Sequence, residues 1–360
     1  MTSIAIQGDI VRGHRSPFLF AGRFVRAWVR RRWALCVGLV IAWLALGAVP
    51  SGARAQEAPD PIRVVATFSI LADMVREVGG DRVVIETIVG PNGDAHAFEP
   101  TPRDARALGA ARVLVRNGLG FEGWLPRLLE SSGFKGLDIV ASEGVRPRIL
   151  SDDEESEHED GAHGGGQNHD GADRAAHQHD HAHAGDVDPH AWQDLVNGVI
   201  YVHNIARGLA AIDPAHAGEY HQRAEDYAAR LEAEDRAWRA SLAAIPQARR
   251  VIMTSHDAFG YLGRAYGIGM VPVLGLSSEA EPSAGTIARL VDRIRARDIH
   301  AVFLEKAVNP ALMRRLTEDT GARIGGTLYA DTLDAPGTPA GTYLGMFRWN
   351  TRQILAAFER

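Results

Sequence analysis

A run of the chain from Glu219 to Ile245 contains neither glycine nor proline, which is typical of one long helix. Asp213 and Pro214 precede it, and these residue types suit the cap and the first turn of a helix. The apolar residues that recur close to helical spacing are Tyr220, Ala224, Tyr227, Leu231 and Trp238. A helix of about 30 residues is about 45 Å long, which exceeds what one small lobe needs. The sequence therefore predicts a linking helix over residues 213–245 that bridges two lobes.

Strands and helices alternate on both sides of this run. Apolar and β-branched segments predict strands at residues 62–69, 82–89, 112–116, 136–141, 250–254, 269–274, 300–304 and 323–329. Helical spacing predicts helices at residues 70–78, 102–108, 121–130, 192–212, 258–266, 283–297, 310–320 and 342–358. Such alternation is typical of α/β lobes with mainly parallel sheets. We therefore expect an N-terminal α/β lobe over residues 56–212 and a C-terminal α/β lobe over residues 246–360.

The N-terminal segment has the features of a secretory signal. Several arginines precede the apolar run Trp33–Val49, and Ala53-Arg54-Ala55 follows it as a small-residue cleavage site. The apolar run is at the short limit for a membrane-spanning helix. We therefore expect a signal peptide over residues 1–55, cleaved after Ala55, and a mature periplasmic protein. Beyond it, we expect no segment long and apolar enough to span a bilayer.

Charge and cysteine content narrow the function further. Residues 1–55 carry eight arginines and one aspartate, so their removal takes the formal net charge from −6 to −13. An acidic secreted protein is a poor candidate for binding nucleic acid or anionic membranes. Cys36 lies at the start of the apolar run, whereas a lipoprotein cysteine lies at its end, so we do not expect lipidation. Without that cysteine, any metal site must use histidine, aspartate and glutamate.

Residues 151–186 form an acidic, glycine-rich insert with almost no large apolar side chain. Such a composition cannot build a core, so we expect the insert to be disordered without metal. Its seven histidines are His158, His163, His169, His177, His179, His181 and His183. Neutral imidazole is a common metal ligand, and we favour weak binding of several ions here over a solvated linker. The insert could gather ions or block the main site when loaded, and the sequence leaves both open.

Four other side chains stand out because each follows a predicted strand or opens a loop: His96, His190, His256 and Asp331. In open α/β sheets, ligands bind beyond the carboxyl ends of the strands. Two of the four belong to each predicted lobe, so we expect them to meet in a cleft between the lobes. Three imidazoles and one carboxylate suit tetrahedral Zn²⁺. Mn²⁺ prefers more oxygen, which a bidentate Asp331 would supply in part.

The sequences around these side chains resemble the metal-binding periplasmic solute receptors of ABC importers, the zinc- and manganese-uptake receptors. The resemblance covers roughly residues 62–360. The segments that carry it are Gly93–Pro102, Asn117–Leu125, Asp188–Trp192, Ser255–Tyr261, Tyr329–Leu333 and Tyr343–Asn350. Each segment is a moderate signal, and together in this order they are a strong one.

The resemblance implies that His96, His190, His256 and Asp331 are the ligands of one transported ion. Histidine rather than glutamate at position 256, with a His-rich insert before His190, resembles the zinc-type receptors. It also implies two (β/α) lobes joined by one rigid helix. The implied partner is an ABC importer with a membrane permease and a cytoplasmic ATPase, because this chain has no phosphate-binding G-x-x-x-x-G-K-[ST] loop. A periplasmic metallochaperone is a further candidate partner, and we expect a monomer.

Other polar residues have plainer interpretations. We expect His203, His216 and His221 to be surface residues on helices, and His300 to have no ligand role. The glutamates that could orient a ligating imidazole are Glu99, Glu281 and Glu305, and a salt bridge or a helix cap is an equal alternative for each.

Three alternatives to high-affinity zinc uptake remain open from sequence. A manganese receptor of the same family would have the same architecture. A secreted zinc-dependent hydrolase would need an open coordination position for water, which four protein ligands would fill, and the chain has no H-E-x-x-H motif. A metal-stabilised surface adhesin is the third alternative. We therefore expect a transport protein and not an enzyme.

Overall fold

The computed structural model describes residues 60–149, 187–275, 284–296, 299 and 301–359. The expected signal peptide, the His-rich insert, Glu281 and His300 lie outside the described residues.

The first sheet has four parallel strands, as the sequence predicts. They are β1 (Ile62–Phe68), β2 (Val83–Val89), β3 (Val113–Arg116) and β4 (Leu137–Val140). Their order is β2-β1-β3-β4, and every neighbouring pair is parallel. The order reverses between β1 and β3, which is where ligand sites form in open parallel sheets.

The second sheet repeats this topology. Its strands are β7 (Val251–Thr254), β8 (Gly269–Pro272), β9 (Ala301–Glu305) and β10 (Arg323–Leu328). The order β10-β9-β7-β8 is the order of the first sheet read from the other edge, and the pairs are again parallel. The α/β fold with two parallel sheets is therefore confirmed.

The helices lie close to their predicted ranges. They are α2 (Ser69–Gly79), α3 (Pro102–Gly109), α4 (Leu125–Ser132), α6 (Leu195–Ile212), α8 (Gly260–Tyr266), α9 (Ala284–Ala296), α10 (Ala311–Thr320) and α11 (Tyr343–Phe358). Helix α4 was expected to begin at Phe121 and begins later. Residues 121–124 form turns instead, in which the N–H of Gly123 bonds to the carbonyl of Phe121 and the N–H of Leu125 bonds to the carbonyl of Glu122.

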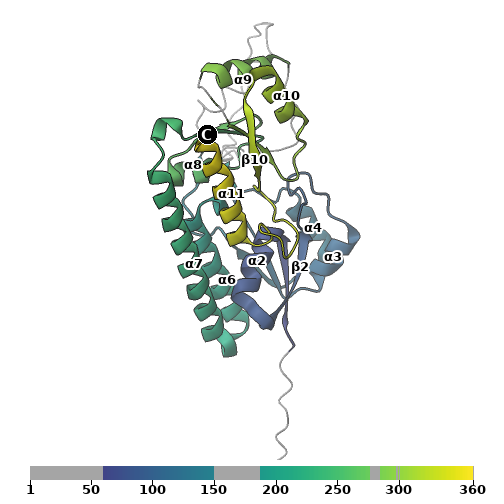
Figure 1. The fold of residues 1–360 in the computed structure, drawn as a ribbon. Coiled ribbons are helices and arrows are strands. Elements are labelled where there is room, and N and C mark those ends of the chain that lie inside the picture. Colours follow the sequence, from purple (N-terminus) through teal and green to yellow (C-terminus); the bar gives the residue numbers. More distant parts are fainter. Residues whose placement is uncertain (1–59, 150–186, 276–283, 297–298, 300, 360) are drawn as a thin grey trace, which may run out of the picture. The chain divides into compact units, whose positions relative to one another are not determined.

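The long helix is α7 (Ala217–Ala243), with 27 residues, and it packs beside α6 (Figure 1). Near its middle, Arg230 forms an ion pair of 2.8 Å with Glu77 of α2. Nearer its end, Arg239 donates a 2.6 Å hydrogen bond to the carbonyl of Ala265 in α8. The same helix therefore contacts helices that belong to each of the two sheets.

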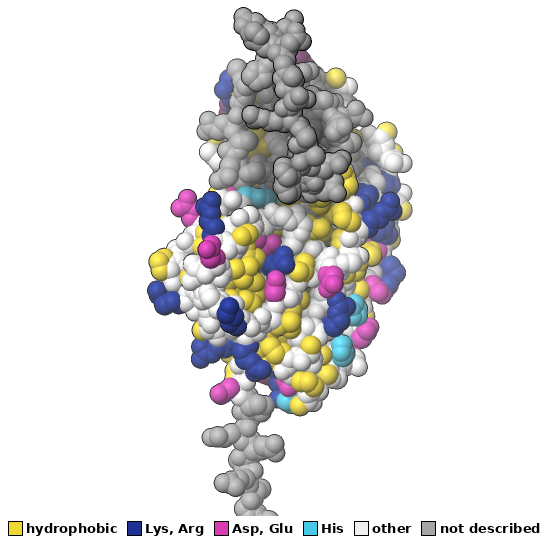
Figure 2. Space-filling view, turned by 180° about the vertical axis from the view of Figure 1, so that it is seen from behind, with side chains coloured by type: hydrophobic (Ala, Val, Ile, Leu, Met, Phe, Trp, Pro, Cys, Tyr) yellow, Lys and Arg dark blue, Asp and Glu magenta, His cyan; other side chains and the backbone are white. Residues whose placement is uncertain are grey.

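The second sheet separates two hydrophobic clusters. Ile252 and Phe303 belong to a cluster shared with the first sheet and with α2, α6 and α7. Met253 and Val302, their neighbours along the same strands, belong to a smaller cluster with residues of α9 and α10. Successive strand residues point to opposite faces, so the smaller cluster covers the other face of this sheet. Figure 2 shows basic and acidic side chains interspersed over the described part of one molecular face.

Helix α6 corrects one expectation. Among the described residues, it has the length and the mean hydropathy, 1.2, of a candidate membrane span. Half of that window is buried, and α6 packs against α2, α7 and β4. Its apolar composition is therefore accounted for by its place in the hydrophobic interior.

A short antiparallel ladder was not predicted. Strand β5 (Arg148–Ile149) pairs with β6 (Val187–Asp188), and these two strands flank the His-rich insert along the chain. Strands of two residues carry no recognisable periodicity, so sequence patterns cannot reveal them.

Candidate metal centre

Four side chains that are far apart in sequence meet at one point. Each of His96, His190, His256 and Asp331 offers one ligand atom, and these atoms all lie within 4.8 Å of one another. His256 Nε2 lies 3.0 Å from one oxygen of Asp331, and His96 Nε2 lies 3.4 Å from that oxygen. The Nε2 atoms of His96 and His190 are 3.2 Å apart. At this spacing, the nitrogen and oxygen atoms of these side chains surround a space of the size of one ion.

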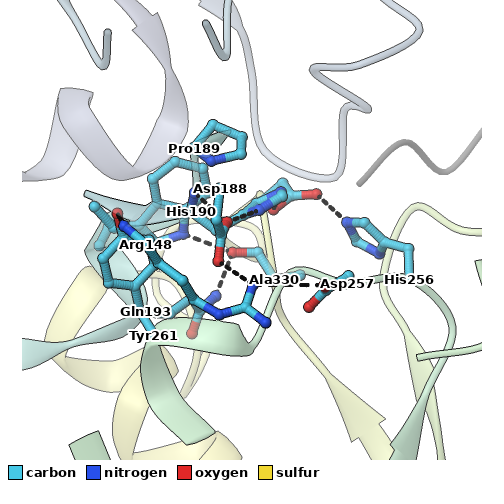
Figure 3. A network of polar contacts seen from close by, with 12 residues as sticks. Arg148, Asp188, Pro189, His190, Gln193, His256, Asp257, Tyr261 and Ala330 are labelled. Atoms are coloured by element: carbon cyan, nitrogen blue, oxygen red, sulfur yellow. Dashed lines mark hydrogen bonds and ion pairs between the residues drawn. The ribbon is translucent and has the colours of Figure 1, made fainter. Parts of the chain in front are cut away.

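His190 is fixed by the carboxylate of Asp188 (Figure 3). One oxygen of Asp188 accepts a 2.9 Å hydrogen bond from the His190 backbone and lies 2.8 Å from its Nδ1. Burial opposes the charge of Asp188, but its contacts with His190 and Arg148 outweigh burial and lower its pKa. An ionised Asp188 keeps the proton on Nδ1, so the Nε2 lone pair of His190 faces the other three side chains.

Glu305, the last residue of β9, lies beside His256. One oxygen of Glu305 accepts hydrogen bonds from the backbone N–H groups of Ser255 and His256. The other oxygen lies 2.6 Å from Nδ1 of His256. Burial opposes the charged imidazolium, but the carboxylates of Glu305 and Asp331 outweigh burial and raise the pKa of His256 well above its ordinary value.

Asp331 follows β10, and two residues of the His190 segment hold its loop. The indole of Trp192 and the amide of Gln193 both donate to the carbonyl of Ala330, at 2.8 and 2.7 Å. Burial opposes the charge of the Asp331 carboxylate, but His190 and His256 outweigh burial and hold the pKa of Asp331 well below its ordinary range. Its Oδ1 atom is buried without a hydrogen-bond partner among the described residues. A buried anionic oxygen of this kind is suited to a cation.

His96 lies in an irregular loop after β2, and its position depends on local turns. The carboxylate of Asp94 accepts a 2.8 Å hydrogen bond from the His96 backbone. The indole of Trp124 donates to the carbonyl of Ala95, and the His96 ring packs edge-on against Phe121. The side chain keeps 11% of its exposure, whereas His190 and His256 keep none. His96 is therefore the most accessible imidazole of the group.

The model of one protein family matches most of the chain. It is described as "Zinc-uptake complex component A periplasmic" (ZnuA), and it matches residues 64–357. The chain belongs to this family.

Proteins that are similar to this chain differ in the metal that they are named for. The manganese-binding lipoprotein MntA of Halalkalibacterium halodurans is 33% identical, over 91% of this chain and 99% of its own. The iron-binding protein YfeA of Yersinia pestis is 29% identical, over 82% of this chain and 86% of its own. The solved periplasmic zinc-binding protein TroA of Treponema pallidum has a TM-score of 0.71 and 28% identity, covering 83% of this chain and all of that one.

ZnuA family membership defines the general role. The family consists of solute-binding transport proteins, so the chain is a metal-binding receptor of an ABC importer rather than an enzyme. The fold expected from the resemblance is likewise confirmed by these structural neighbours.

Of the glutamates that could orient a ligating imidazole, the structure describes Glu305 and Glu99. Glu305 faces a candidate ligand imidazole, as one of its two interpretations predicted. Glu99 is exposed, and the carboxylate beside His190 belongs to Asp188 instead. Sequence reasoning treated Asp188 only as part of a motif, although an aspartate two residues before a candidate ligand was a usable signal. The seven insert histidines lie outside the described residues.

The three helix histidines lie away from the four candidate ligands. His203 lies 3.9 Å from Glu225, and His216 lies 2.8 Å from Asp213. His221 is exposed on α7.

A second buried glutamate, which sequence reasoning also missed, supports the His190 segment indirectly. Glu122 accepts hydrogen bonds from the backbone of Asn117 at 2.6 Å and from the hydroxyl of Thr67 at 2.8 Å. The amide of Asn117 in turn donates to the carbonyl of Pro189 at 2.9 Å. Burial raises the pKa of Glu122, and its hydrogen bonds oppose this only in part.

Proposed function

We propose that this protein captures Zn²⁺ as its transported substrate and delivers it to an ABC importer. His96, His190, His256 and Asp331 would ligate the ion. A membrane permease and a cytoplasmic ATPase would complete the importer. The observation that carries the proposal is the convergence of four candidate ligand atoms within 4.8 Å of one another.

The chemistry of the four side chains supports zinc. Zn²⁺ binds imidazole nitrogen and carboxylate oxygen in a tetrahedron, with bonds of about 2.0–2.2 Å. Four protein ligands fill this tetrahedron and leave no position for the water that a catalytic zinc site needs. The buried Oδ1 of Asp331, which has no hydrogen-bond partner among the described residues, supports a cation at this point rather than a neutral ligand.

Manganese is the second candidate, and two observations favour it. The two oxygens of Asp331 face different imidazoles, His190 at 3.5 Å and His256 at 3.0 Å, so both could contact one ion and supply the oxygen that Mn²⁺ prefers. MntA is named for manganese, and a structural neighbour from candidatus Liberibacter asiaticus, 25% identical with a TM-score of 0.68, is described as manganese-bound.

The periplasm is the proposed location. The family description names it, and the expected signal peptide over residues 1–55 agrees with it. MntA is named a lipoprotein, whereas the position of Cys36 in this chain favours a soluble mature protein.

Calorimetric titration tests the site. We expect one tight Zn²⁺ site in the wild type, in His221→Ala, whose imidazole is exposed on α7, and in a variant lacking residues 151–186. His256→Ala should abolish tight binding. A tight site that survives His256→Ala, or that disappears with residues 151–186, would contradict the proposed ligands.

Affinity alone does not identify the transported metal, because zinc binds most nitrogen and oxygen sites more tightly than manganese. The metal content of cells with and without the protein decides between them, measured under separate zinc and manganese limitation. We expect the loss of the protein to lower zinc uptake selectively. A selective loss of manganese uptake would assign Mn²⁺ as the substrate and leave the site unchanged.

A further inference from the structure

One arginine lies between the two segments that carry His190 and His256. Arg148, in β5, places its Nη1 nitrogen 3.1 Å from Oδ2 of Asp188 and 3.5 Å from Oδ2 of Asp257 (Figure 3). A single nitrogen therefore contacts two carboxylates that are far apart in sequence. Guanidinium suits this role because its charge is permanent and its donors are held in one plane.

Both carboxylates are adjacent to candidate ligands. Asp188 uses its other oxygen to fix Nδ1 of His190. Asp257 directly follows His256 in the chain. The Arg148 guanidinium thus connects the His190 segment to the segment that follows β7 of the second sheet.

The fold provides a fitted place for this guanidinium. A Cβ atom on Gly260, the first residue of α8, would lie within 2.4 Å of Cζ and Nη1 of Arg148. The neighbouring Tyr261 hydroxyl accepts a 2.9 Å hydrogen bond from the Arg148 backbone. The Arg148 side chain keeps only 15% of its exposure. The close contact requires glycine at 260, and the arginine cannot move far without losing several interactions.

The electrostatics favour the same role. Asp188 is fully buried, and the side chain of Asp257 keeps 12% of its exposure. Two carboxylates brought to one nitrogen repel each other when no cation separates them, and the repulsion is strong where water is scarce. Without Arg148, the His190 and His256 segments would therefore be pushed apart.

We propose that Arg148 is a positioning residue that holds the His190 and His256 segments at the separation that metal binding requires. This inference rests on the proposed metal-receptor function. Residues that orient metal ligands typically change metal affinity by about 10- to 100-fold when they are replaced. We expect a loss in this range when the guanidinium is removed.

The test uses four variants of the full mature chain: Arg148→Ala, Arg148→Lys, Gly260→Ala and the double variant Arg148→Ala/Gly260→Ala. Gly260→Ala leaves every charge in place but occupies the space of the guanidinium. Arg207→Ala is the matched control for arginine, because Arg207 pairs with an exposed Glu143. Gly218→Ala is the matched control for glycine, because nothing lies within 4 Å of its added Cβ.

Zn²⁺ affinity is measured by competition with a chromophoric chelator, and the d–d absorption of bound Co²⁺ reports the geometry of the site. Arg148→Ala and Gly260→Ala should each weaken Zn²⁺ binding about 10-fold or more and alter the Co²⁺ spectrum. The double variant should be no weaker than Arg148→Ala, since both changes act on one contact. Arg148→Lys should restore part of the affinity, and both controls should match the wild type.

The outcomes separate this inference from the proposed function. Wild-type affinity and an unchanged Co²⁺ spectrum in Arg148→Ala would overturn the positioning role while the metal receptor stands. Fully additive losses in the double variant would also overturn it, because Gly260 would then act independently of Arg148. Absence of tight Zn²⁺ or Mn²⁺ binding in the wild type would instead refute the receptor itself.

Discussion

The two sheets share one strand order, and each has a buried glutamate near the point where that order reverses. In the second sheet, Glu305 ends β9 and accepts N–H groups from the loop after β7. In the first sheet, Glu122 follows β3 and accepts the hydroxyl of Thr67 on β1. Both carboxylates therefore join the ends of the two central strands of their sheet.

The glutamates differ in how they reach the candidate metal ligands. The free oxygen of Glu305 contacts the His256 ring directly at 2.6 Å. Glu122 reaches the His190 segment only through Asn117, which bonds to the Pro189 carbonyl. The carboxylate that contacts the His190 imidazole directly is Asp188, which belongs to β6 of the separate ladder. One topology can thus orient a ligand from within the sheet or from a separate ladder beside it.

The largest effect on metal affinity is expected from removing a ligand of the second half. His256→Ala deletes a nitrogen donor and leaves Glu305 and Asp331 as buried carboxylates without their shared partner. Replacing a residue that only orients a ligand typically lowers metal affinity by about 10- to 100-fold, and the loss in His256→Ala should be larger. Chelator competition measures it, and a loss below 10-fold would remove His256 from the ligand set.

Glu305→Gln should have the next largest effect. The amide oxygen can still accept from Ser255 and His256, but the amide nitrogen would then face Nδ1 of His256 as a donor. This favours the wrong tautomer, with the proton on Nε2, and should weaken Zn²⁺ binding about 10- to 100-fold. Chelator competition measures the loss, and an affinity within about 3-fold of the wild type would show that Glu305 does not orient His256.

Glu122→Gln should have a much smaller effect on affinity. Its carboxylate touches Asn117 rather than an imidazole, so we expect a change in Zn²⁺ affinity of less than about 3-fold. The same chelator competition measures it. If Glu122→Gln weakens binding as much as Glu305→Gln does, the distinction between direct and indirect support fails.

Asp73, a further buried carboxylate, should affect the stability of the protein. Burial raises the pKa of Asp73 from 3.8 to about 6, although the Tyr343 N–H donates to it at 2.8 Å. The folded state then binds this proton more tightly than the unfolded chain, so raising the pH from about 4 to about 6 should lower stability. The full loss is on the order of 3 kcal/mol, and about two-thirds of it falls between pH 4.5 and pH 7.

Urea unfolding of the metal-free wild type and of Asp73→Asn is compared at pH 4.5 and at pH 7. The difference in the free energy of unfolding between the two proteins measures the contribution of Asp73. The asparagine keeps an acceptor for Tyr343 but has no charge to bury. The wild type should lose stability relative to the variant as the pH rises. A difference that does not change with pH would contradict the expected proton linkage.

The sequence was informative where a long pattern or a short motif carried the signal. The alternation of segments predicted both parallel sheets, and the run from Glu219 to Ile245 predicted α7. The four residues after strand ends or at loop starts were predicted to meet, and they do. Strand order was not predicted, because periodicity reveals a strand but not its neighbours.

The sequence was uninformative where the structure depends on contacts between distant residues. Arg148 and Asp188 are 40 positions apart, on either side of the His-rich insert, and no local pattern relates them. Glu122 looked like a helix residue, but it serves as an acceptor for a turn with positive φ. Residues of this kind are recognised only when the three-dimensional partner is known.

The β5–β6 ladder has a consequence for engineering. Ile149 pairs with Val187, so the two residues that flank positions 150–186 lie next to each other. Closing a longer loop between fixed ends adds only about 0.6 kcal/mol for each doubling of its length. A peptide grafted between these two residues should therefore cost little stability, and its ends would lie beside the ion pair of Arg148 and Asp188.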